Sequence, residues 1–172
     1  MSQTLSALNS SDRAAFVAAL GHLFEHSPWV ADETFPLRPF ADADSLHAAL
    51  CATMFGAPAE RQLALVRAHP DLAGRLAQAG ALTADSAREQ AAAGLDRLTP
   101  GEASEIVRLN DAYQARFGFP FVICARLNAK AAILASMRSR VANGPKEELS
   151  TALAEIAKIA RLRLNEAITK EN

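Results

Sequence analysis

The chain has 172 residues, of which half are hydrophobic and 22% are charged, a composition typical of a globular protein of one domain. The formal net charge of -1 gives no general electrostatic reason to bind nucleic acid or an acidic membrane. No apolar run approaches the roughly 20 residues that span a bilayer, and the first residues lack the pattern of a secretory signal. Two lone cysteines, Cys51 and Cys124, favour reduced thiols over a disulfide or metal framework. We therefore expect a single domain over residues 1–172, located in the cytoplasm.

Helix signals dominate the first part of the chain. Residues 10–12 can cap a helix that runs to about His26, where a serine–proline pair ends it. Residues 31–44 contain two prolines and predict an irregular connection. Asp and Ser can cap a helix over about residues 44–54. The next helix is predicted over about residues 58–68. It must stop near Ala68 because Pro70 follows, and the residue before a proline avoids the helical region.

The sequence HLFEH, residues 22–26, matches the inverted zinc-protease pattern H-x-x-E-H. Two histidines four apart on one helix can hold zinc. The chain is short for such an enzyme, and polar rings near a helix C-terminus are favourable without any metal. We expect no metal site here, and a zinc hydrolase built on His22, Glu25 and His26 remains an alternative.

The stretch RAHPDLAGRLA, residues 67–77, interrupts the helical pattern with a His-Pro-Asp sequence. Pro70 suits the first position of a new short helix, predicted over residues 71–78, because its missing N–H costs nothing there. His69 would then lie at the N-terminus of that helix, whose positive end favours a neutral ring at pH 7. Such an imidazole can act as an acid or base. Alternatively, His69 is a loop residue hydrogen-bonded to the backbone.

The next stretch, SAREQ, carries a second set of polar candidates. Ser86 and Glu89 match a capping box, in which Ser86 caps a helix and Glu89 reaches back to it. The functional alternative aims Ser86, Glu89 and Gln90 from a helix start into a pocket, where free N–H groups stabilise the oxygens of a polar substrate. The sequence leaves both interpretations open.

The sequence FGFPFVICAR, residues 117–126, breaks the pattern of the second half and is called the Phe-rich segment below. Its Gly118 and Pro120 oppose a regular helix, whereas its Phe, Val and Ile favour an extended chain. Helices are predicted over about residues 83–96, 99–116, 128–142 and 146–169, the third capped by Asn128. We expect an all-α fold, a single compact domain of about eight helices with this one extended segment.

The last predicted helix carries an arginine in its apolar stripe. At about 100° per residue, one face collects Leu149, Leu153, Ile156, Ala160 and Ala167. Arg163 lies in this stripe, whereas Arg161 projects on the polar face. A buried guanidinium keeps its proton and needs an anion beside it. That anion is either a structural Glu or Asp, or the carboxylate of a ligand. In the second case Glu89 could contact the same ligand.

Five stretches occur together in one order along most of the chain: FEHSPWVA (24–31), AHPDLAGRLA (68–77), SAREQAAAGLD (86–96), FGFPFVICARL (117–127) and IARLRLNE (159–166). With them the sequence resembles the family of 2-oxo-4-hydroxy-4-carboxy-5-ureidoimidazoline (OHCU) decarboxylases, which complete the route from urate to (S)-allantoin. Each stretch alone is weak, but HPDLAG, S-x-x-EQ-x-x-AGLD and FGFPFVICAR together are specific.

The resemblance implies an all-α decarboxylase that uses no cofactor or metal, binds a small-molecule substrate and forms a homodimer. From charge and hydropathy we expect neither nucleic acid nor a membrane as a partner. The family's catalytic residues fall on His69, Glu89 and Arg163. Its substrate contacts fall on Pro70, Ser86, Gln90 and the backbone of Phe121, Val122, Ile123, Cys124 and Ala125.

The working hypothesis gives His69 the proton transfers, with Glu89 orienting either His69 or the substrate. The Phe-rich segment would supply unpaired backbone N–H donors to a planar ligand and close the pocket with its aromatic rings. The alternative is a non-catalytic helical module that binds a partner through this segment. His69 and Arg163 would then be structural.

Overall fold

The computed structural model describes residues 3–74, 77 and 79–169. The described residues form nine α-helices and no β-sheet, which confirms the all-α class. A single parallel bridge pairs Gln3 with Ile168. No helix in the described part of the chain is long and apolar enough to cross a membrane.

The chain divides into two compact units, and each is described by itself. Unit 1 comprises Met1–Ala68 and Ala157–Asn172, and unit 2 comprises His69–Ile156. The long helix α10 (Pro145–Ala167) contributes its first part to unit 2 and its last part to unit 1. The expectation of one domain over residues 1–172 stays a prediction.

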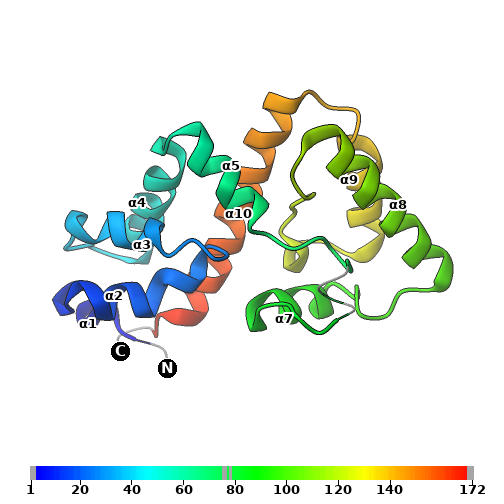
Figure 1. The fold of residues 1–172 in the computed structure, drawn as a ribbon. Coiled ribbons are helices and arrows are strands. Elements are labelled where there is room, and N and C mark those ends of the chain that lie inside the picture. Colours follow the sequence, from blue (N-terminus) through cyan, green and yellow to red (C-terminus); the bar gives the residue numbers. More distant parts are fainter. Residues whose placement is uncertain (1–2, 75–76, 78, 170–172) are drawn as a thin grey trace. The chain divides into compact units, whose positions relative to one another are not determined.

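Unit 1 packs the N-terminal helices and the end of α10 around an apolar core (Figure 1). Its elements are α1 (Leu5–Ser10), α2 (Arg13–Leu20), η1 (Gly21–Leu23), α3 (Trp29–Thr34), η2 (Phe35–Leu37), α4 (Ala43–Gly56) and α5 (Ala59–Arg67). Helix α3 contacts both α2 and α4. The side chains of Phe16, Leu46 and Leu164 are fully buried there, because one face of each amphipathic helix is apolar.

Three predictions for unit 1 need correction. Helix α2 ends at Leu20 instead of about His26 and passes into the 3-10 turn η1. A Cβ at Gly21 would lie 3.1 Å from the Pro28 Cβ, so the chain folds back closely after α2. Residues 31–44 are not wholly irregular, since α3 and η2 occupy residues 29–37. The cap of α4 is Asp42, which forms a capping box with Ser45.

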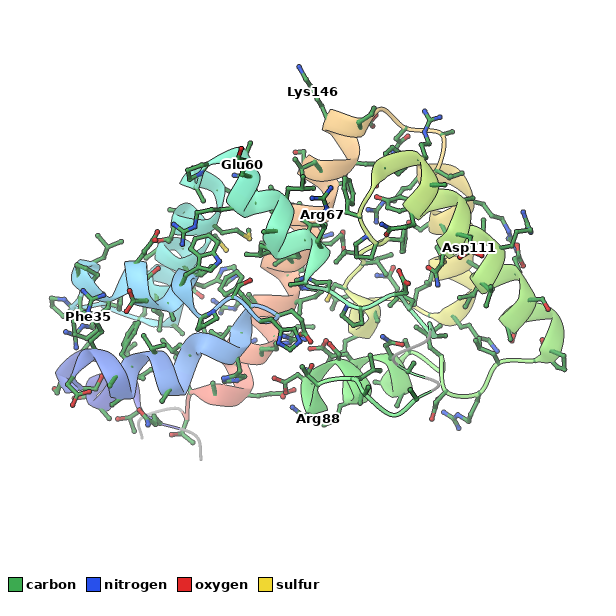
Figure 2. The ribbon with its side chains drawn as sticks, in the orientation of Figure 1. Phe35, Glu60, Arg67, Arg88, Asp111 and Lys146 are labelled. Atoms are coloured by element: carbon green, nitrogen blue, oxygen red, sulfur yellow. The ribbon has the colours of Figure 1, made fainter. Side chains whose placement is uncertain are left out.

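Unit 2 contains the remaining helices, and its buried side chains include Ile106 of α8, Ile133 of α9 and Ile156 in the first part of α10. Its elements are α7 (Ala84–Ala92), α8 (Pro100–Phe117), η3 (Ala125–Leu127) and α9 (Lys130–Arg140). Thr99 and Glu102 form a capping box at the start of α8, and Gly118 ends it in the left-handed conformation, with φ 73°. The predicted helix over residues 99–116 is confirmed. Lys146, an exposed residue at the start of α10, points away from the helices in Figure 2.

The helix predicted over residues 71–78 does not begin at its expected start. Residues 71–74 form a turn, whereas residues 75, 76 and 78 lie outside the described residues. Helix α7 ends at Ala92, short of the predicted position 96, because the chain leaves it through Gly94 at φ 79°. Asn128 does not cap α9; its amide donates to the Cys124 carbonyl at 3.0 Å.

The Phe-rich segment is extended over residues 119–124, as predicted, whereas Phe117 ends α8 and Ala125 begins η3. All residues from Phe119 to Ala125 are buried. Phe117, Phe119 and Phe121 each contact the ring of Tyr113, with ring centroids 4.5 to 5.9 Å apart. Aromatic packing of this kind fixes the segment without a helix or sheet.

Candidate active site

His69 lies at the start of a tight turn, residues 69–74, which we call the His69 turn. The His69 side chain is buried, with 7% of its surface exposed. The Gly74 N–H donates to the Asp71 carbonyl at 3.4 Å, and Ala73 adopts a left-handed φ of 48°. A Cβ at Gly74 would lie 2.6 Å from the Asp71 Cβ, so only glycine fits there. Because residues 71–74 are not helical, the proposed helix N-terminus beside His69 is wrong.

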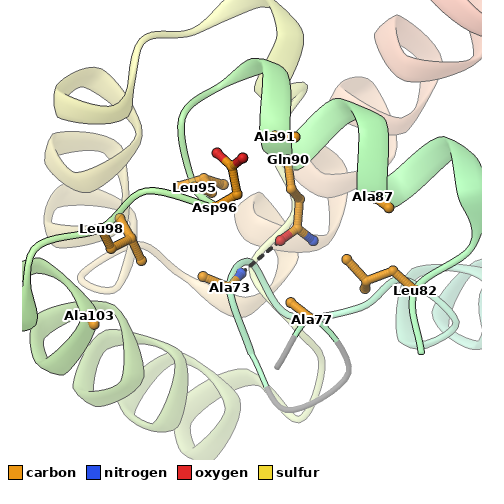
Figure 3. Close-up of a pocket in the computed structure, with 10 residues that line it drawn as sticks. All are labelled: Ala73, Ala77, Leu82, Ala87, Gln90, Ala91, Leu95, Asp96, Leu98 and Ala103. Atoms are coloured by element: carbon orange, nitrogen blue, oxygen red, sulfur yellow. Dashed lines mark hydrogen bonds between the residues drawn. The ribbon is translucent and has the colours of Figure 1, made fainter. Parts of the chain in front are cut away.

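Two buried amide side chains hold the backbone of the His69 turn. Gln90 of α7 accepts a hydrogen bond at Oε1 from the Ala73 N–H at 2.8 Å, which Figure 3 shows, and its Nε2 lies 3.5 Å from the Asp71 carbonyl. Asn110 of α8 donates from Nδ2 to the Leu72 carbonyl at 2.9 Å. Both amide residues are 6% exposed. The conformation of the turn is therefore set by side chains from two helices.

The polar residues of α7 are arranged differently from the predicted capping box. Thr83 is the N-cap, and its hydroxyl accepts from the Ser86 N–H at 3.3 Å. Ser86 is buried inside the first turn, and Glu89 lies farther along the helix and is half-buried. The Ser86–Glu89 capping box is therefore wrong, and the role of both residues in substrate binding or catalysis stays a prediction.

A cavity of about 460 Å³ lies beside Gln90. Figure 3 shows its lining, which is Ala73, Ala77, Leu82, Ala87, Gln90, Ala91, Leu95, Asp96, Leu98 and Ala103. Alanine and leucine make up most of these walls, and neither His69 nor Glu89 belongs to them. The cavity therefore lacks the acid–base residues that the predicted chemistry needs, and we do not place the substrate in it.

The backbone of the Phe-rich segment makes specific polar contacts. The Cys124 N–H donates to Oε2 of Glu155 in α10 at 2.8 Å. Nη1 of Arg140 in α9 donates to the Val122 carbonyl at 2.8 Å, and its guanidinium lies 4.3 Å from the centre of the Phe121 ring. The expectation of unpaired backbone donors is therefore wrong at Cys124. A substrate oxygen at that N–H would have to displace the carboxylate of Glu155.

Arg140 also belongs to a buried polar cluster. Its Nη2 lies 2.8 Å from Oε2 of Glu148, whose Oε1 accepts from Asn143 at 2.9 Å. The hydroxyl of Tyr113 donates to the same carboxylate. Burial raises the pKa of Glu148, but the hydrogen bonds from Arg140, Tyr113 and Asn143 outweigh it and keep that pKa below its usual range. The ion pair is charged at neutral pH.

Arg163, in unit 1, confirms the prediction drawn from the apolar stripe of the last helix. It is 3% exposed, and its Nη1 lies 3.1 Å from Oε2 of Glu25 and 3.2 Å from the His22 carbonyl. Arg161 forms a partly exposed ion pair with Asp44 at 2.6 Å. Glu25 is thus an anionic partner of Arg163, and the sequence suggested Glu25 only as a zinc ligand.

The structure does not support the zinc alternative at His22, Glu25 and His26. His22 lies in the 3-10 turn η1, and His26 has a left-handed φ of 47°, so the two histidines do not share one face of a helix. Within the described residues, no group of three or more His, Cys, Asp or Glu side chains could hold a metal ion.

Three chain segments that carry predicted site residues meet in unit 2. Gln90 joins α7 to the His69 turn, and α7 also packs against η3, which begins at Ala125 of the Phe-rich segment. Ser86 and Glu89 lie on the same helix, α7. Arg163 belongs to unit 1, and its participation in this site stays a prediction.

The fold and these segments define a helical protein with a buried histidine on a turn that two amide side chains hold. The model of the OHCU decarboxylase family matches residues 9–165. The chain belongs to the OHCU decarboxylase family.

Relatives of nearly the same length agree with this assignment. The chain is 44% identical to the 2-oxo-4-hydroxy-4-carboxy-5-ureidoimidazoline decarboxylase of Amia calva, over 94% of this chain and 92% of that protein. It is 42% identical to the corresponding decarboxylase of Haloferax volcanii, over 98% of both chains.

Two solved structures resemble the fold. A crystal structure of (S)-allantoin synthase matches with a TM-score of 0.81 and 29% identity, over 99% of this chain and 55% of that chain. A crystal structure of OHCU decarboxylase in the presence of (S)-allantoin matches with a TM-score of 0.69 and 20% identity, over 93% of this chain and all of that chain. The second likeness bears on the fold alone.

Proposed function

We propose that this protein decarboxylates OHCU to (S)-allantoin in the degradation of urate. The observation that carries the proposal is the match over nearly the whole chain to decarboxylases named for this substrate, at 44% identity in the case of Amia calva. The buried histidine on a clamped turn supports it, because acid–base chemistry needs a positioned proton carrier.

The chemistry of the substrate explains what the protein must supply. OHCU carries a carboxylate and a hydroxyl on one ring carbon, beside a carbon–nitrogen double bond. Loss of carbon dioxide leaves an electron pair that this imine absorbs, so the substrate contains its own electron sink. The protein holds the carboxylate out of the ring plane so that the breaking bond overlaps the imine. It then delivers a proton to one face of the neighbouring carbon, which gives one enantiomer.

Each predicted site residue has a part in this scheme. His69 takes the proton of the hydroxyl and returns one to carbon, and the imine nitrogen that received the electron pair takes a proton from water. Glu89 orients the imidazole or the substrate. Arg163 stabilises negative charge on the carboxylate or on ring oxygens. Glu25, which lies 3.1 Å from Arg163, orients the guanidinium.

The proposed substrate contacts include groups that the fold already uses. They are Pro70, Ser86, Gln90 and the backbone of Phe121, Val122, Ile123, Cys124 and Ala125. Oε1 of Gln90 is engaged with the Ala73 N–H, and its Nε2 contact with the Asp71 carbonyl is long, at 3.5 Å. The amide NH2 carries two hydrogens, so this group is the part of Gln90 that donates to a substrate oxygen.

The setting of the enzyme is part of the proposal. We infer a homodimer in the cytoplasm with a small molecule as its substrate. Light scattering coupled to gel filtration measures the assembly: a mass near twice 18.3 kDa supports the dimer, and a mass near the single value contradicts it.

The stereochemistry of the product tests the reaction. Freshly generated products of urate oxidation form racemic allantoin slowly without an enzyme. We expect the protein to accelerate the reaction and to give the circular dichroism signal of (S)-allantoin. A rate and a signal equal to those without protein would refute the activity and favour the non-catalytic helical module instead.

A further inference from the structure

The His69 turn has a conformation that its own sequence does not favour. Ala73 has a left-handed φ of 48°, which a residue with a Cβ rarely adopts. Such a conformation persists only where the surrounding structure holds it. The residues that hold the turn therefore also fix the backbone from which the His69 imidazole projects.

Three backbone groups of residues 71–73 contact two side chains. The Asp71 carbonyl and the Ala73 N–H face the amide of Gln90, and the Leu72 carbonyl between them accepts from Asn110 at 2.9 Å. The amide of Asn110 comes from the middle of α8, a helix whose start is fixed separately by its capping box. The Asn110 contact is thus not required to form α8. It acts on the conformation of the turn instead.

The chemistry of the Asn110 amide fits this task. Its Nδ2 supplies the donor that the Leu72 carbonyl needs, whereas an aspartate at neutral pH would have no donor to offer. Its Oδ1 is buried and has no hydrogen-bond partner among the described residues. An apolar residue would avoid this unsatisfied acceptor but would leave the Leu72 carbonyl without a donor. The donor is therefore the part of the side chain that the fold uses.

We propose that Asn110 is a positioning residue for the decarboxylation, which acts by holding the Leu72 carbonyl and thereby the His69 imidazole. This inference rests on the proposed function in one respect, the role of His69 as proton carrier. Gln90 shares the task from α7, so the turn is clamped from two helices by neutral groups. Both groups of this clamp are neutral amides.

The test replaces Asn110 with leucine, which keeps the size of the side chain and removes the donor. Asp111→Asn, an exposed neighbour on the same helix, is the matched control. Hydrogen exchange of the Ala73 N–H reports whether the turn opens, because this N–H shares a peptide group with the Leu72 carbonyl and bonds to Gln90. In Asn110→Leu we expect exchange about tenfold faster or more, a kcat about tenfold lower or more and a KM changed by less than about threefold. The control should match the wild type.

The outcomes separate this proposal from the proposed function. Faster exchange with an unchanged kcat, or unchanged exchange, would overturn the positioning role. If Asn110→Leu does not fold, Asn110→Ser is measured by the same criteria, since serine is small, polar and too short to reach the Leu72 carbonyl. If the wild-type protein does not turn over OHCU, the proposed function fails. The exchange rates then still show whether Asn110 holds the turn.

Discussion

The two non-helical segments of unit 2 that carry predicted site residues are held by different kinds of side chain. The His69 turn is held by the neutral amides of Gln90 and Asn110. The Phe-rich segment is held by charged groups, with Arg140 on the Val122 carbonyl and Glu155 on the Cys124 N–H. Both segments are buried, so both need specific partners for their backbone groups.

The difference sets how each segment responds to change. Removal of one partner from a buried ion pair leaves an uncompensated charge, which costs far more than the loss of one neutral hydrogen bond. The charged anchor of the Phe-rich segment should therefore be sensitive to mutation and pH. The stability that the neutral clamp beside His69 provides should depend on mutation but not on pH.

The largest effect on stability is expected for Arg140→Met. This change leaves the carboxylate of Glu148 buried without its cation and removes the donor of the Val122 carbonyl. We expect the free energy of unfolding in urea to fall by about 3–5 kcal/mol. Arg138→Met, on the same helix, breaks only an exposed ion pair with Glu105 and should barely change the urea concentration at the midpoint of unfolding. Equal losses in the two variants would contradict the comparison.

A second, pH-dependent effect follows from Glu148. Its pKa in the folded protein is lower than the ordinary value of 4.5, so the unfolded chain binds the proton more tightly and stability falls as the pH drops below about 5. Thermal unfolding between pH 3 and 7 should show this decline, and Glu148→Gln should be less stable at pH 7 but flatter in its pH dependence. If the stability of Glu148→Gln fell with pH as steeply as that of the wild type, other carboxyl groups would be responsible for the decline.

The alkaline side of the profile depends on Tyr113 of the same cluster. Burial, together with its hydrogen bond to Glu148, raises the pKa of Tyr113 above the ordinary value of 10. A raised pKa adds stability below pH 10 that is lost as the pH rises through the folded value. Tyr113→Phe should remove this alkaline loss, which ultraviolet titration of tyrosinate alongside unfolding can follow.

A smaller effect is expected from the neutral clamp. Gln90→Leu removes the acceptor of the Ala73 N–H and should lower the free energy of unfolding by about 1–3 kcal/mol, by the same amount from pH 5 to 8. Gln114→Leu, an exposed glutamine on α8, serves as the control. A loss for Gln90→Leu that grows with acid would mean that the clamp is coupled to a titrating group.

The smallest expected effect is the energetic coupling between the two amides. Gln90 and Asn110 bind adjacent backbone groups of one turn, so the losses of unfolding free energy in the two single variants should not add. A double-mutant cycle on stability with Gln90→Leu and Asn110→Leu should give an interaction energy of about 0.5–1 kcal/mol. Strict additivity would show that the amides hold the turn independently.

Periodicity predicted part of this arrangement from the sequence. The apolar stripe of the last helix identified Arg163 as buried because α10 is long and regular enough to keep its period over all its turns. The same reasoning on α9 would have found Arg140, which stands with Ile133 and Met137 on the buried face. That signal was present in the sequence and was missed.

Other features had no local signal. Glu25 is 138 residues from its partner Arg163, and sequence spacing cannot pair residues so far apart. Asn110 lies within an ordinary helix, and its role depends on the backbone of a turn whose left-handed Ala73 no propensity predicts. The early end of α2 was also missed, because the close approach of Gly21 to Pro28 is a tertiary contact.

The rate of OHCU decarboxylation by a folded His69→Asn variant tests the central claim most directly. Asparagine keeps hydrogen-bonding capacity but cannot carry a proton at neutral pH. Decarboxylation followed through the dichroism of (S)-allantoin should fall by about 100-fold or more, while the far-ultraviolet spectrum and the melting temperature stay near those of the wild type. Undiminished turnover in the folded variant would contradict the proposed role of the buried imidazole.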